Sequence, residues 1–309
     1  MILTIKNVTK QYATHRALDE VSVDVPQGSI YGLLGPNGAG KTSLIRIINQ
    51  ITAPDAGEVL FQGEKLRQKH IGMIGYLPEE RGLYKKMEVG EQALYLAQLK
   101  GMNRKEAVLR LREWFEKFEL QGWWRKKVEE LSKGMQQKVQ FIITVLHEPK
   151  LLILDEPFTG FDPINANLIK DELLKLRDKG TTIILSTHRM ESVEELCSHI
   201  ALINRSHKIL DGAVRDIRKN FKSEKYEIEY QGHAIGFANS LWAGYELLSH
   251  EPHGDMMKAV IKMGEGGTTN NLLAALIANV EVHSFREIVP GMNDIFISLV
   301  KESNEQHVI

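Results

Sequence analysis

A glycine-rich octapeptide near the N-terminus has the residue types that bind phosphate groups. It reads Gly35-Pro36-Asn37-Gly38-Ala39-Gly40-Lys41-Thr42 and lies between apolar residues 30–34 and an apolar helical segment, residues 43–51, that begins with Ser43. Backbone N–H groups and the helix N-terminus can cradle phosphates, Lys41 can reach the β and γ phosphates, and Thr42 can bind Mg²⁺. A chance glycine-rich turn is the alternative. Such a turn would need neither an apolar strand before it nor an apolar helix after it, and this sequence has both. The segment from Gly35 to Ser43 is therefore predicted to bind a nucleotide.

Two carboxylates end the most apolar of the candidate strands. Residues 151–154 read Leu-Leu-Ile-Leu, Glu156 follows Asp155, and Asp155 lies 114 residues after Lys41. A phosphoryl-transfer site needs a carboxylate that holds Mg²⁺ and a group that orients or deprotonates the attacking water. Asp155 can fill the first role and Glu156 the second. Alone, these residues could form a solvated turn. Beside the glycine-rich loop 35–42, which has the pattern and context of a P-loop, they predict hydrolysis of a nucleoside triphosphate.

The elements that must position these residues follow an α/β pattern up to about residue 220, because short apolar runs alternate with longer amphipathic stretches. The expected strands are residues 2–8, 21–25, 30–34, 71–77, 151–155, 181–186 and 200–204. Residues 21–25 alternate in polarity and predict an antiparallel strand with one wet face, whereas 151–154 and 181–185 predict strands that are buried on both faces. Helical spacing in residues 88–99, 103–118 and 136–146 predicts a helical subdomain at about 85–148.

The pattern changes after residue 220, and residues 221–309 are predicted to form a small α+β domain beside the 1–220 domain. The expected elements are strands at 226–230, 256–263 and 280–288 and helices at 271–279 and 293–301. Gly264, Gly266 and Gly267 mark a turn. This segment holds 12 Asp and Glu against 6 Lys and Arg, so it is acidic, although the whole chain has a formal net charge of −1.

Composition describes a globular chain without a membrane span. Its 309 residues are 43% hydrophobic and 26% charged, which suits about two domains. The longest nearly apolar stretch, residues 272–280, is far shorter than the roughly 20 residues of a transmembrane helix. A lone cysteine, Cys197, and the lack of a basic leader predict a reducing, cytosolic location. The near-zero net charge gives no field that would attract nucleic acid.

A third motif lies between the P-loop and the two carboxylates. Leu131-Ser132-Lys133-Gly134-Met135-Gln136 resembles the Leu-Ser-Gly-Gly-Gln signature of the ATP-binding cassette (ABC) family, with departures at Lys133 and Met135. The resemblance covers residues 1 to about 220 and implies that Ser132 and Gly134 cap the γ-phosphate bound by an opposite cassette. An ordinary serine N-cap on the following helix is the alternative.

The resemblance assigns further roles, each with a structural alternative. Tyr12 is in the position of the aromatic residue that stacks on adenine, and a packed edge-strand tyrosine is the alternative. His188, 32 residues after Glu156, resembles the switch histidine that contacts the γ-phosphate, so Lys41, Glu156 and His188 are the expected catalytic residues. The tetrapeptide Gly160-Phe161-Asp162-Pro163 resembles a dimer-contacting loop, although an Asp-Pro turn would suffice.

Glu79 departs from the family pattern. It stands where most cassettes have a glutamine that touches Mg²⁺ and relays movement to the membrane subunit. Its carboxylate adds a negative charge and donates no hydrogen bond, so we expect Glu79 to strengthen or alter Mg²⁺ binding. A solvated loop carboxylate is the alternative. The run Pro78-Glu79-Glu80-Arg81-Gly82-Leu83-Tyr84 and the small C-terminal domain resemble bacterial sodium-efflux and drug-efflux ATP-binding proteins.

The resemblance implies an ATPase subunit at the cytoplasmic face of the cell membrane. It would bind ATP and Mg²⁺, pair with a second copy or a paralogue, and drive a separate transmembrane permease, as an exporter. A soluble ABC ATPase that acts on nucleic acid or ribosomes is the alternative, as is an ATP-binding regulator without turnover. The aromatic and cationic residues between Trp114 and Lys127 could bind single strands. Their helical spacing favours a buried stripe instead, so no nucleic acid partner is expected.

Overall fold

The chain divides into two compact units. The computed structural model describes residues 1–80, 82–222, 224–241, 244–264 and 266–306. One unit holds Met1–Val214 together with the segment from Leu299 onward, and the other holds Arg215–Ser298. Arg81, which belongs to the expected efflux-type run, lies outside the described residues, as do residues 307–309 of the expected C-terminal domain.

The first unit contains a six-stranded sheet with the order β10-β9-β3-β8-β7-β6. Its strands are β3 (Ile30–Leu34), β6 (Ile74–Leu77), β7 (Leu151–Asp155), β8 (Thr182–Ser186), β9 (His199–Asn204) and β10 (His207–Ala213). All neighbours pair in parallel except β9 and β10, which form an antiparallel hairpin. A second sheet is antiparallel and has the order β2-β1-β4-β5, from β1 (Leu3–Tyr12), β2 (His15–Val25), β4 (Ala56–Phe61) and β5 (Glu64–Lys65). The predicted α/β class is confirmed.

Strand burial follows the apolar patterns with one exception. Every residue of β7 and β8 is buried, whereas β2 alternates between buried valines and exposed Asp24. The exception is the expected strand 71–77, whose first three residues belong instead to the 3₁₀ segment η1 (Gln68–Met73). The ring of His70 accepts a hydrogen bond from the backbone N–H of Arg67 at 3.1 Å, and this local turn competes with strand pairing.

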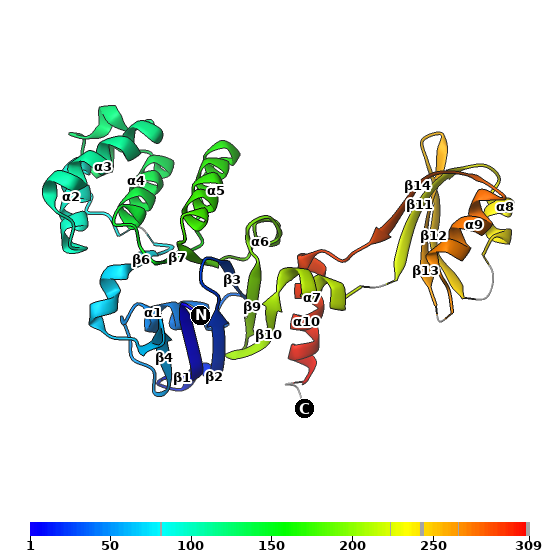
Figure 1. Cartoon of the computed structure of the whole chain (residues 1–309), viewed down its shortest axis with the longest axis horizontal. Coiled ribbons are helices and arrows are strands. Elements are labelled where there is room, and N and C mark those ends of the chain that lie inside the picture. The colour runs from blue at the N-terminus through cyan, green and yellow to red at the C-terminus, as the bar shows by residue number, and fades with distance from the viewer. Residues whose placement is uncertain (81, 223, 242–243, 265, 307–309) are drawn as a thin grey trace. The chain divides into compact units, whose positions relative to one another are not determined.

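The helices of the first unit gather beside the parallel sheet. They are α1 (Lys41–Ile48), α2 (Val89–Leu99), α3 (Arg104–Lys117), α4 (Lys133–Val145), α5 (Pro163–Asp178) and α6 (Met190–Leu196), with 3₁₀ segments η2 (Gln121–Trp123) and η3 (Val128–Glu130). Figure 1 shows α2, α3 and α4 grouped as the predicted helical subdomain. Asn103, Ser132 and Asp162 cap α3, α4 and α5 through side-chain oxygen atoms that accept backbone N–H groups. The sequence patterns do not predict the helices α5 and α6.

Aromatic rings fill the interior of the helical subdomain. Phe115 and Phe118 are buried, and Trp114 is half-buried. The ring centroids of Phe118 and Phe141 are 5.9 Å apart, and those of Phe115 and Trp124 are 5.3 Å apart. These are ordinary packing distances between aromatic side chains. The interpretation of this run as a buried stripe is therefore confirmed.

The second unit is built on an antiparallel sheet with the order β12-β13-β11-β14. Its elements are β11 (Lys225–Gln231), α8 (Ala234–Asn239), β12 (Tyr245–His253), β13 (Met256–Met263), α9 (Thr269–Ile277) and β14 (Glu281–Ile288). Helices α7 (Val214–Asn220) and α10 (Met292–Gln306) contribute residues to both units. No expected element covers α8 or β12. Strand β12 is an edge strand, mostly exposed, that contains Pro252, so it lacks the apolar alternation of a half-buried strand.

The boundary between the two expected domains stays a prediction. The first unit ends at Val214 and regains the segment from Leu299, whereas the sequence places the boundary at residue 220 and assigns the whole C-terminal segment to the second domain. Within the described part of the chain, no helix combines the length and the hydropathy that spanning a bilayer requires.

Candidate nucleotide-binding site

The glycines of the P-loop lie where a side chain would clash or where φ is positive. Gly35, Gly38 and Gly40 have φ values of 150°, 78° and 115°. A Cβ atom on Gly35 would lie 2.2 Å from the carbonyl oxygen of Ile203, and one on Gly40 would lie 2.3 Å from the carbonyl oxygen of Ala17. Gly38 meets no heavy atom within 4 Å of its Cβ position. The loop therefore presents backbone groups, at the N-terminus of α1, to an open side.

Lys41 is held over this loop by the loop itself. Its Nζ atom donates hydrogen bonds to the carbonyl oxygens of Gly35 and Pro36, at 2.7 and 3.0 Å. Burial lowers the pKa of Lys41, and the negative charge of Glu156 is the largest effect that opposes this shift. A buried ammonium group has three donors, and phosphate oxygens would supply both acceptors and the missing negative charge.

A cleft of about 430 Å³ collects most of the residues that the sequence singles out. It is lined by Tyr12, His15, Ala17, Asn37, Gly38, Ala39, Gly40, Lys41, Thr42, Ser43, Arg46, Glu79, Asp155, Glu156 and His188. This volume is in the usual range for small-molecule sites. Gly35 and Pro36 lie outside the lining because they form the base of the loop under Lys41.

The two carboxylates reach the cleft because β7 and β8 are parallel neighbours. Asp155 pairs with Ser186, and the backbone N–H of Glu156 donates to the carbonyl oxygen of Ser186 at 2.9 Å. Both strands thus end at one edge of the sheet. Asp155 is only 5% exposed. Burial raises the pKa of Asp155, the charges of Glu79 and Glu156 raise it further, and Lys41 opposes them.

Glu156 and His188 are in direct contact. The Nδ1 atom of His188 lies 2.7 Å from Oε1 of Glu156, and the backbone N–H of His188 donates to the same oxygen at 3.0 Å. The hydroxyl of Thr187 donates to the other carboxylate oxygen at 3.3 Å. An ionised carboxylate accepts hydrogen bonds only, so the ring proton belongs on Nδ1 in this arrangement. The three contacts fix the Glu156 carboxylate at the floor of the cleft.

Three residues that line the cleft, His15, Ala17 and Arg46, are not singled out by the sequence patterns. His15 belongs to the hairpin that follows Tyr12, and Arg46 lies on α1, five residues after Lys41. Arg46 could have been expected from its place on the first helix after a P-loop, whereas nothing in the local pattern marks His15. Tyr12 is exposed beside Lys10, whose Nζ atom is 5.4 Å from the ring centroid.

Ser132 and Gly134 lie apart from this cleft. They are absent from its lining, and Ser132 is exposed. The hydroxyl of Ser132 accepts a hydrogen bond from the backbone N–H of Met135 at 3.2 Å, as an N-cap does. The ordinary capping role is thus present, and a contact of these two residues with a nucleotide on another cassette stays a prediction.

The cleft contains oxygen atoms that could bind a metal ion, but the part of the protein that the structure describes does not by itself supply a complete set of metal ligands. Thr42, Glu79 and Asp155 line it together, and hydroxyl and carboxylate oxygens are the ligands that Mg²⁺ prefers. Among the described residues, no three His, Cys, Asp or Glu side chains are grouped closely enough to hold a metal ion. This donor set suits a Mg²⁺ ion that takes most of its ligands from phosphates and water.

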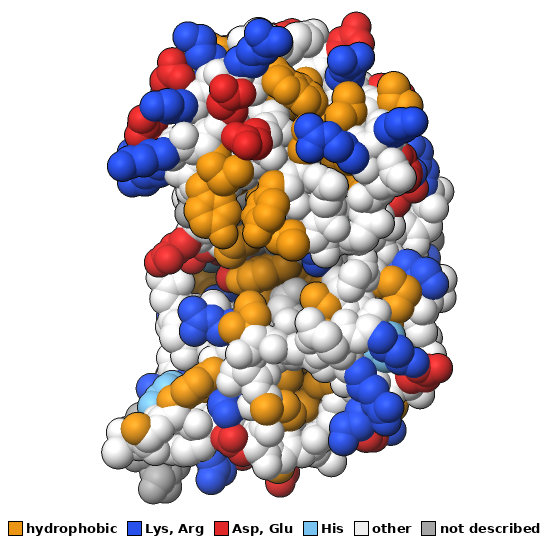
Figure 2. Space-filling view, turned by 90° about the vertical axis from the view of Figure 1, so that its left-hand side faces the viewer, with side chains coloured by type: hydrophobic (Ala, Val, Ile, Leu, Met, Phe, Trp, Pro, Cys, Tyr) orange, Lys and Arg blue, Asp and Glu red, His pale blue; other side chains and the backbone are white. Residues whose placement is uncertain are grey.

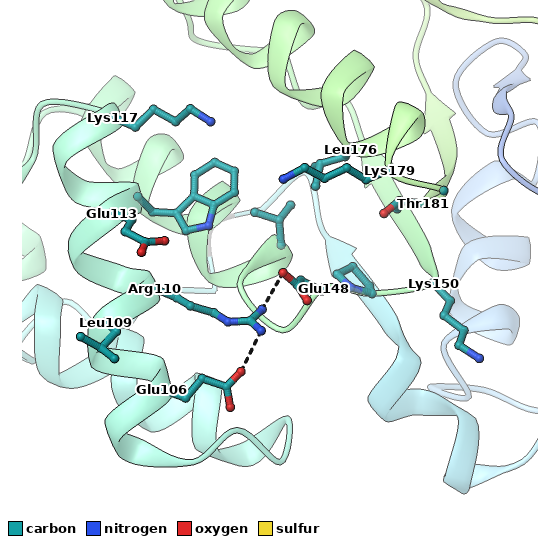
Figure 3. A pocket seen from close by; sticks show the side chains of 14 residues that line it. Glu106, Leu109, Arg110, Glu113, Lys117, Glu148, Lys150, Leu176, Lys179 and Thr181 are labelled. Carbon is teal, nitrogen blue, oxygen red and sulfur yellow. Dashed lines mark ion pairs between the residues drawn. The ribbon is translucent and has the colours of Figure 1, made fainter.

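A larger cleft of about 870 Å³ contains none of the predicted site residues. It lies between α3, α5 and the segment before β7, and Figure 3 shows its charged side chains. Arg110 on α3 pairs with Glu106 of the same helix and with Glu148, which follows α4, at 2.8 Å each, so the second ion pair joins two segments of the helical subdomain. No P-loop or strand-end carboxylate faces this cleft, so its size does not make it the nucleotide site.

Two family models match the chain. The model described as ABC transporter matches residues 18–159, and the model of the ATP-binding protein DrrA1-3-like C-terminal domain matches residues 212–300. The ABC transporter ATP-binding protein YhaQ of Bacillus subtilis is 39% identical over 97% of this chain and 98% of its own length. The Nod factor export ATP-binding protein I of Cupriavidus metallidurans is 33% identical over 70% of this chain and 72% of its own length.

Solved structures agree with these matches. The structure of an ATP-binding subunit of an ABC transporter superposes with a TM-score of 0.67 and 30% sequence identity. The superposition covers 72% of this chain and 93% of the ATP-binding subunit.

Proposed function

The chain belongs to the ABC transporter ATP-binding protein family and is an ATPase subunit of a transporter, and from this we propose that it dimerises on ATP and drives a separate transmembrane permease as an exporter. Its place would be peripheral, on the cytoplasmic face of the membrane. One observation supports the proposal most strongly. The P-loop, Asp155, Glu156 and His188 line one cleft, whereas the signature residues Ser132 and Gly134 lie outside it. The Cupriavidus relative is named for the export of Nod factor, which supports the direction of transport.

Dimerisation would complete each site. In this chain Ser132 and Gly134 are too far from the cleft to line it, and both are at least partly accessible on the first turn of α4. The N-terminus of a helix attracts phosphate through its free N–H groups and its dipole. A second copy, or a paralogue, would place this turn against the γ-phosphate. ATP would then lie between two subunits, and its hydrolysis would remove the contact that holds them together.

Hydrolysis would follow from the contacts in the cleft. The P-loop and Lys41 hold the phosphates, and Glu156 orients the water and accepts its proton as the γ-phosphoryl group leaves ADP. His188 keeps the carboxylate in position through its contact with Oε1. Thr42, Asp155 and Glu79 would hold a Mg²⁺ ion, and the chemistry that this ion would supply is positive charge beside the phosphate oxygens.

Glu79→Gln is expected to raise the Mg²⁺ concentration for half-maximal ATPase activity about fivefold, because one unit charge near an ion in a wet cleft is worth about 1 kcal/mol. Glu79 lines the cleft, whereas its exposed neighbour Glu80 does not. Glu80→Gln is therefore the matched control and should leave the value unchanged. The measurement is a Mg²⁺ titration of ATP hydrolysis at fixed ATP. An unchanged Mg²⁺ dependence in Glu79→Gln would show that this carboxylate has no metal role.

An apolar groove beside α2 is suited to a helix of the permease. Its volume is about 590 Å³, and its apolar lining includes Ile51, Ile71, Leu83, Leu96, Leu99 and Ile143. Figure 2 looks onto this side of the first unit and shows hydrophobic side chains gathered between the helical subdomain and the core. Burial lowers the pKa of His147, which also lines the groove, to about 4, so the ring is uncharged at neutral pH. The apolar face of an amphipathic helix would bury these side chains.

Leu99→Asp is expected to reduce recovery of the protein with native membranes about tenfold or more, because one buried leucine is worth about 1.5–3 kcal/mol. Leu99 is 65% exposed and lines the groove. Leu109, 62% exposed on the neighbouring helix α3, lines the other cleft. Leu109→Asp is the matched control and should fractionate like the wild type. Equal membrane recovery of both variants would refute the docking site, and cosedimentation with ribosomes or DNA would favour the soluble class.

A further inference from the structure

The end of α10 is joined to the end of β9 by a buried polar contact. The Nδ2 atom of Asn204 donates to Oγ of Ser303 at 3.1 Å and to Oδ1 of Asn304 at 3.2 Å. Asn204 is 3% exposed and Ser303 is 7% exposed. All three residues belong to the first unit. A buried amide of this kind is costly unless its partners are present, so the contact ties the C-terminal segment to one strand end.

Asn204 begins a two-residue turn with a strained backbone. Asn204 pairs with His207 across the β9–β10 hairpin, and the two residues between them, Arg205 and Ser206, have φ values of 44° and 72°. Two-residue hairpin turns with positive φ at both positions favour Asn and Gly. Arg and Ser pay a conformational cost there, and such a conformation persists only where the surroundings hold it.

The P-loop and β2 hold this turn in place. The backbone N–H of Ser206 donates to the carbonyl oxygen of Ala39, in the P-loop, at 3.1 Å. The hydroxyl of Ser206 donates to the carbonyl oxygen of Arg16 at 2.5 Å, and the N–H of Asp19 donates to the carbonyl oxygen of Ser206 at 2.9 Å. These bonds fasten the turn to the P-loop on one side and to β2 on the other.

The same segment also supports the start of the P-loop. The carbonyl oxygen of Ile203, the residue before Asn204, occupies the place where a side chain on Gly35 would be. Residues 203–206 therefore contact the P-loop at Gly35 and at Ala39. A shift of this segment would move the N–H groups that cradle the phosphates, because the P-loop rests on it at both points.

We propose that Asn204 is a positioning residue for the P-loop and that the C-terminal turn of α10 sets the affinity for ATP through it. The path runs from Ser303 and Asn304 to Asn204, then through the β9–β10 turn to Ala39. None of these groups touches the reacting phosphate, so their loss should weaken the binding of ATP and of the transition state equally. The proposal holds whether or not the subunit pairs with a permease.

Asn204→Ala and Ser303→Ala, each in the full chain, are expected to raise the KM for ATP about fivefold while kcat stays within twofold of the wild type. Ser303→Ala removes one small group and is the milder change if Asn204→Ala folds poorly. The double variant should have the KM of Asn204→Ala alone, since the hydrogen bond lost in Ser303→Ala is also lost in Asn204→Ala. Ser303→Thr, which keeps the hydroxyl, should restore the KM towards the wild-type value.

Lys301→Ala, an exposed position on the same helix, is the control and should leave the KM unchanged. A merely structural role would lower the melting temperature of the Asn204 and Ser303 variants without changing their KM. An unchanged KM in folded Asn204→Ala and Ser303→Ala would overturn the proposal. An equal rise in Lys301→Ala would overturn it as well.

Discussion

Glu156→Gln is expected to lower kcat for ATP hydrolysis at least about a hundredfold while the Kd for ATP changes less than threefold. Glutamine has the shape of glutamate and still offers its carbonyl oxygen to the backbone N–H of His188, which lies 3.0 Å from Oε1. It cannot accept the proton of the attacking water, and general base catalysis contributes about 10²–10⁴ to the rate. The measurements are phosphate release under saturating MgATP and calorimetric titration of ATP.

Glu113→Gln is the matched control for this substitution. Glu113 is exposed and lines the cleft between α3 and α5, away from the P-loop. Its kcat should equal that of the wild type. If Glu156→Gln kept more than a tenth of the wild-type kcat, another group would be the base and the assignment of Glu156 would be wrong.

Lys41→Met is expected to weaken ATP binding about 10- to 100-fold, because a charge-assisted hydrogen bond to phosphate is worth about 1.5–3 kcal/mol. It should do so without destabilising the fold. Burial lowers the pKa of Lys41, so its ammonium charge is unfavourable in the protein before phosphate binds. Methionine has a similar length and carries no charge, and the melting temperature without nucleotide should therefore stay the same or rise.

Weaker ATP binding together with an unchanged or higher melting temperature would distinguish a binding-site residue from a structural one. Thermal unfolding without nucleotide, together with titration of ATP, measures both quantities in the same sample. Lys65→Met, at an exposed position on β5, is the control and should change neither. Wild-type ATP affinity in Lys41→Met would contradict the placement of phosphates against the P-loop.

The sequence predicts part of the cleft, namely the polar site residues that directly follow a buried strand. The apolar runs 151–154 and 181–185 predict strands that are buried on both faces. The structure shows them as parallel neighbours, and their register places Asp155 opposite Ser186, with Glu156 and His188 next along the chain. Strand ends of a parallel sheet meet at one edge, so the motifs converge for a physical reason. The P-loop glycines are likewise explained by close backbone approach at Gly35 and Gly40.

Other features leave no local pattern that a sequence reading can use. The pair Asn204 and Ser303 is 99 residues apart along the chain, and only tertiary packing brings the two together. Strand β12 is mostly exposed, so its residues need not alternate. The first three residues of the expected strand 71–77 belong to a 3₁₀ segment, in which the ring of His70 accepts a hydrogen bond from the N–H of Arg67. Ser132 caps its own helix, and its expected contact with ATP belongs to a second chain that one sequence does not describe.

We propose that two such subunits close on ATP and drive a permease. Purification of tagged Glu156→Gln from native membranes in MgATP tests this, with the mass and composition of the complex as the readout. The expected result is a complex of two cassettes with a polytopic membrane protein. When the permease is absent and MgADP replaces MgATP in detergent, a single cassette is expected. A lone cassette with bound ATP and no membrane protein, or a complex with ribosomes or DNA, would contradict it.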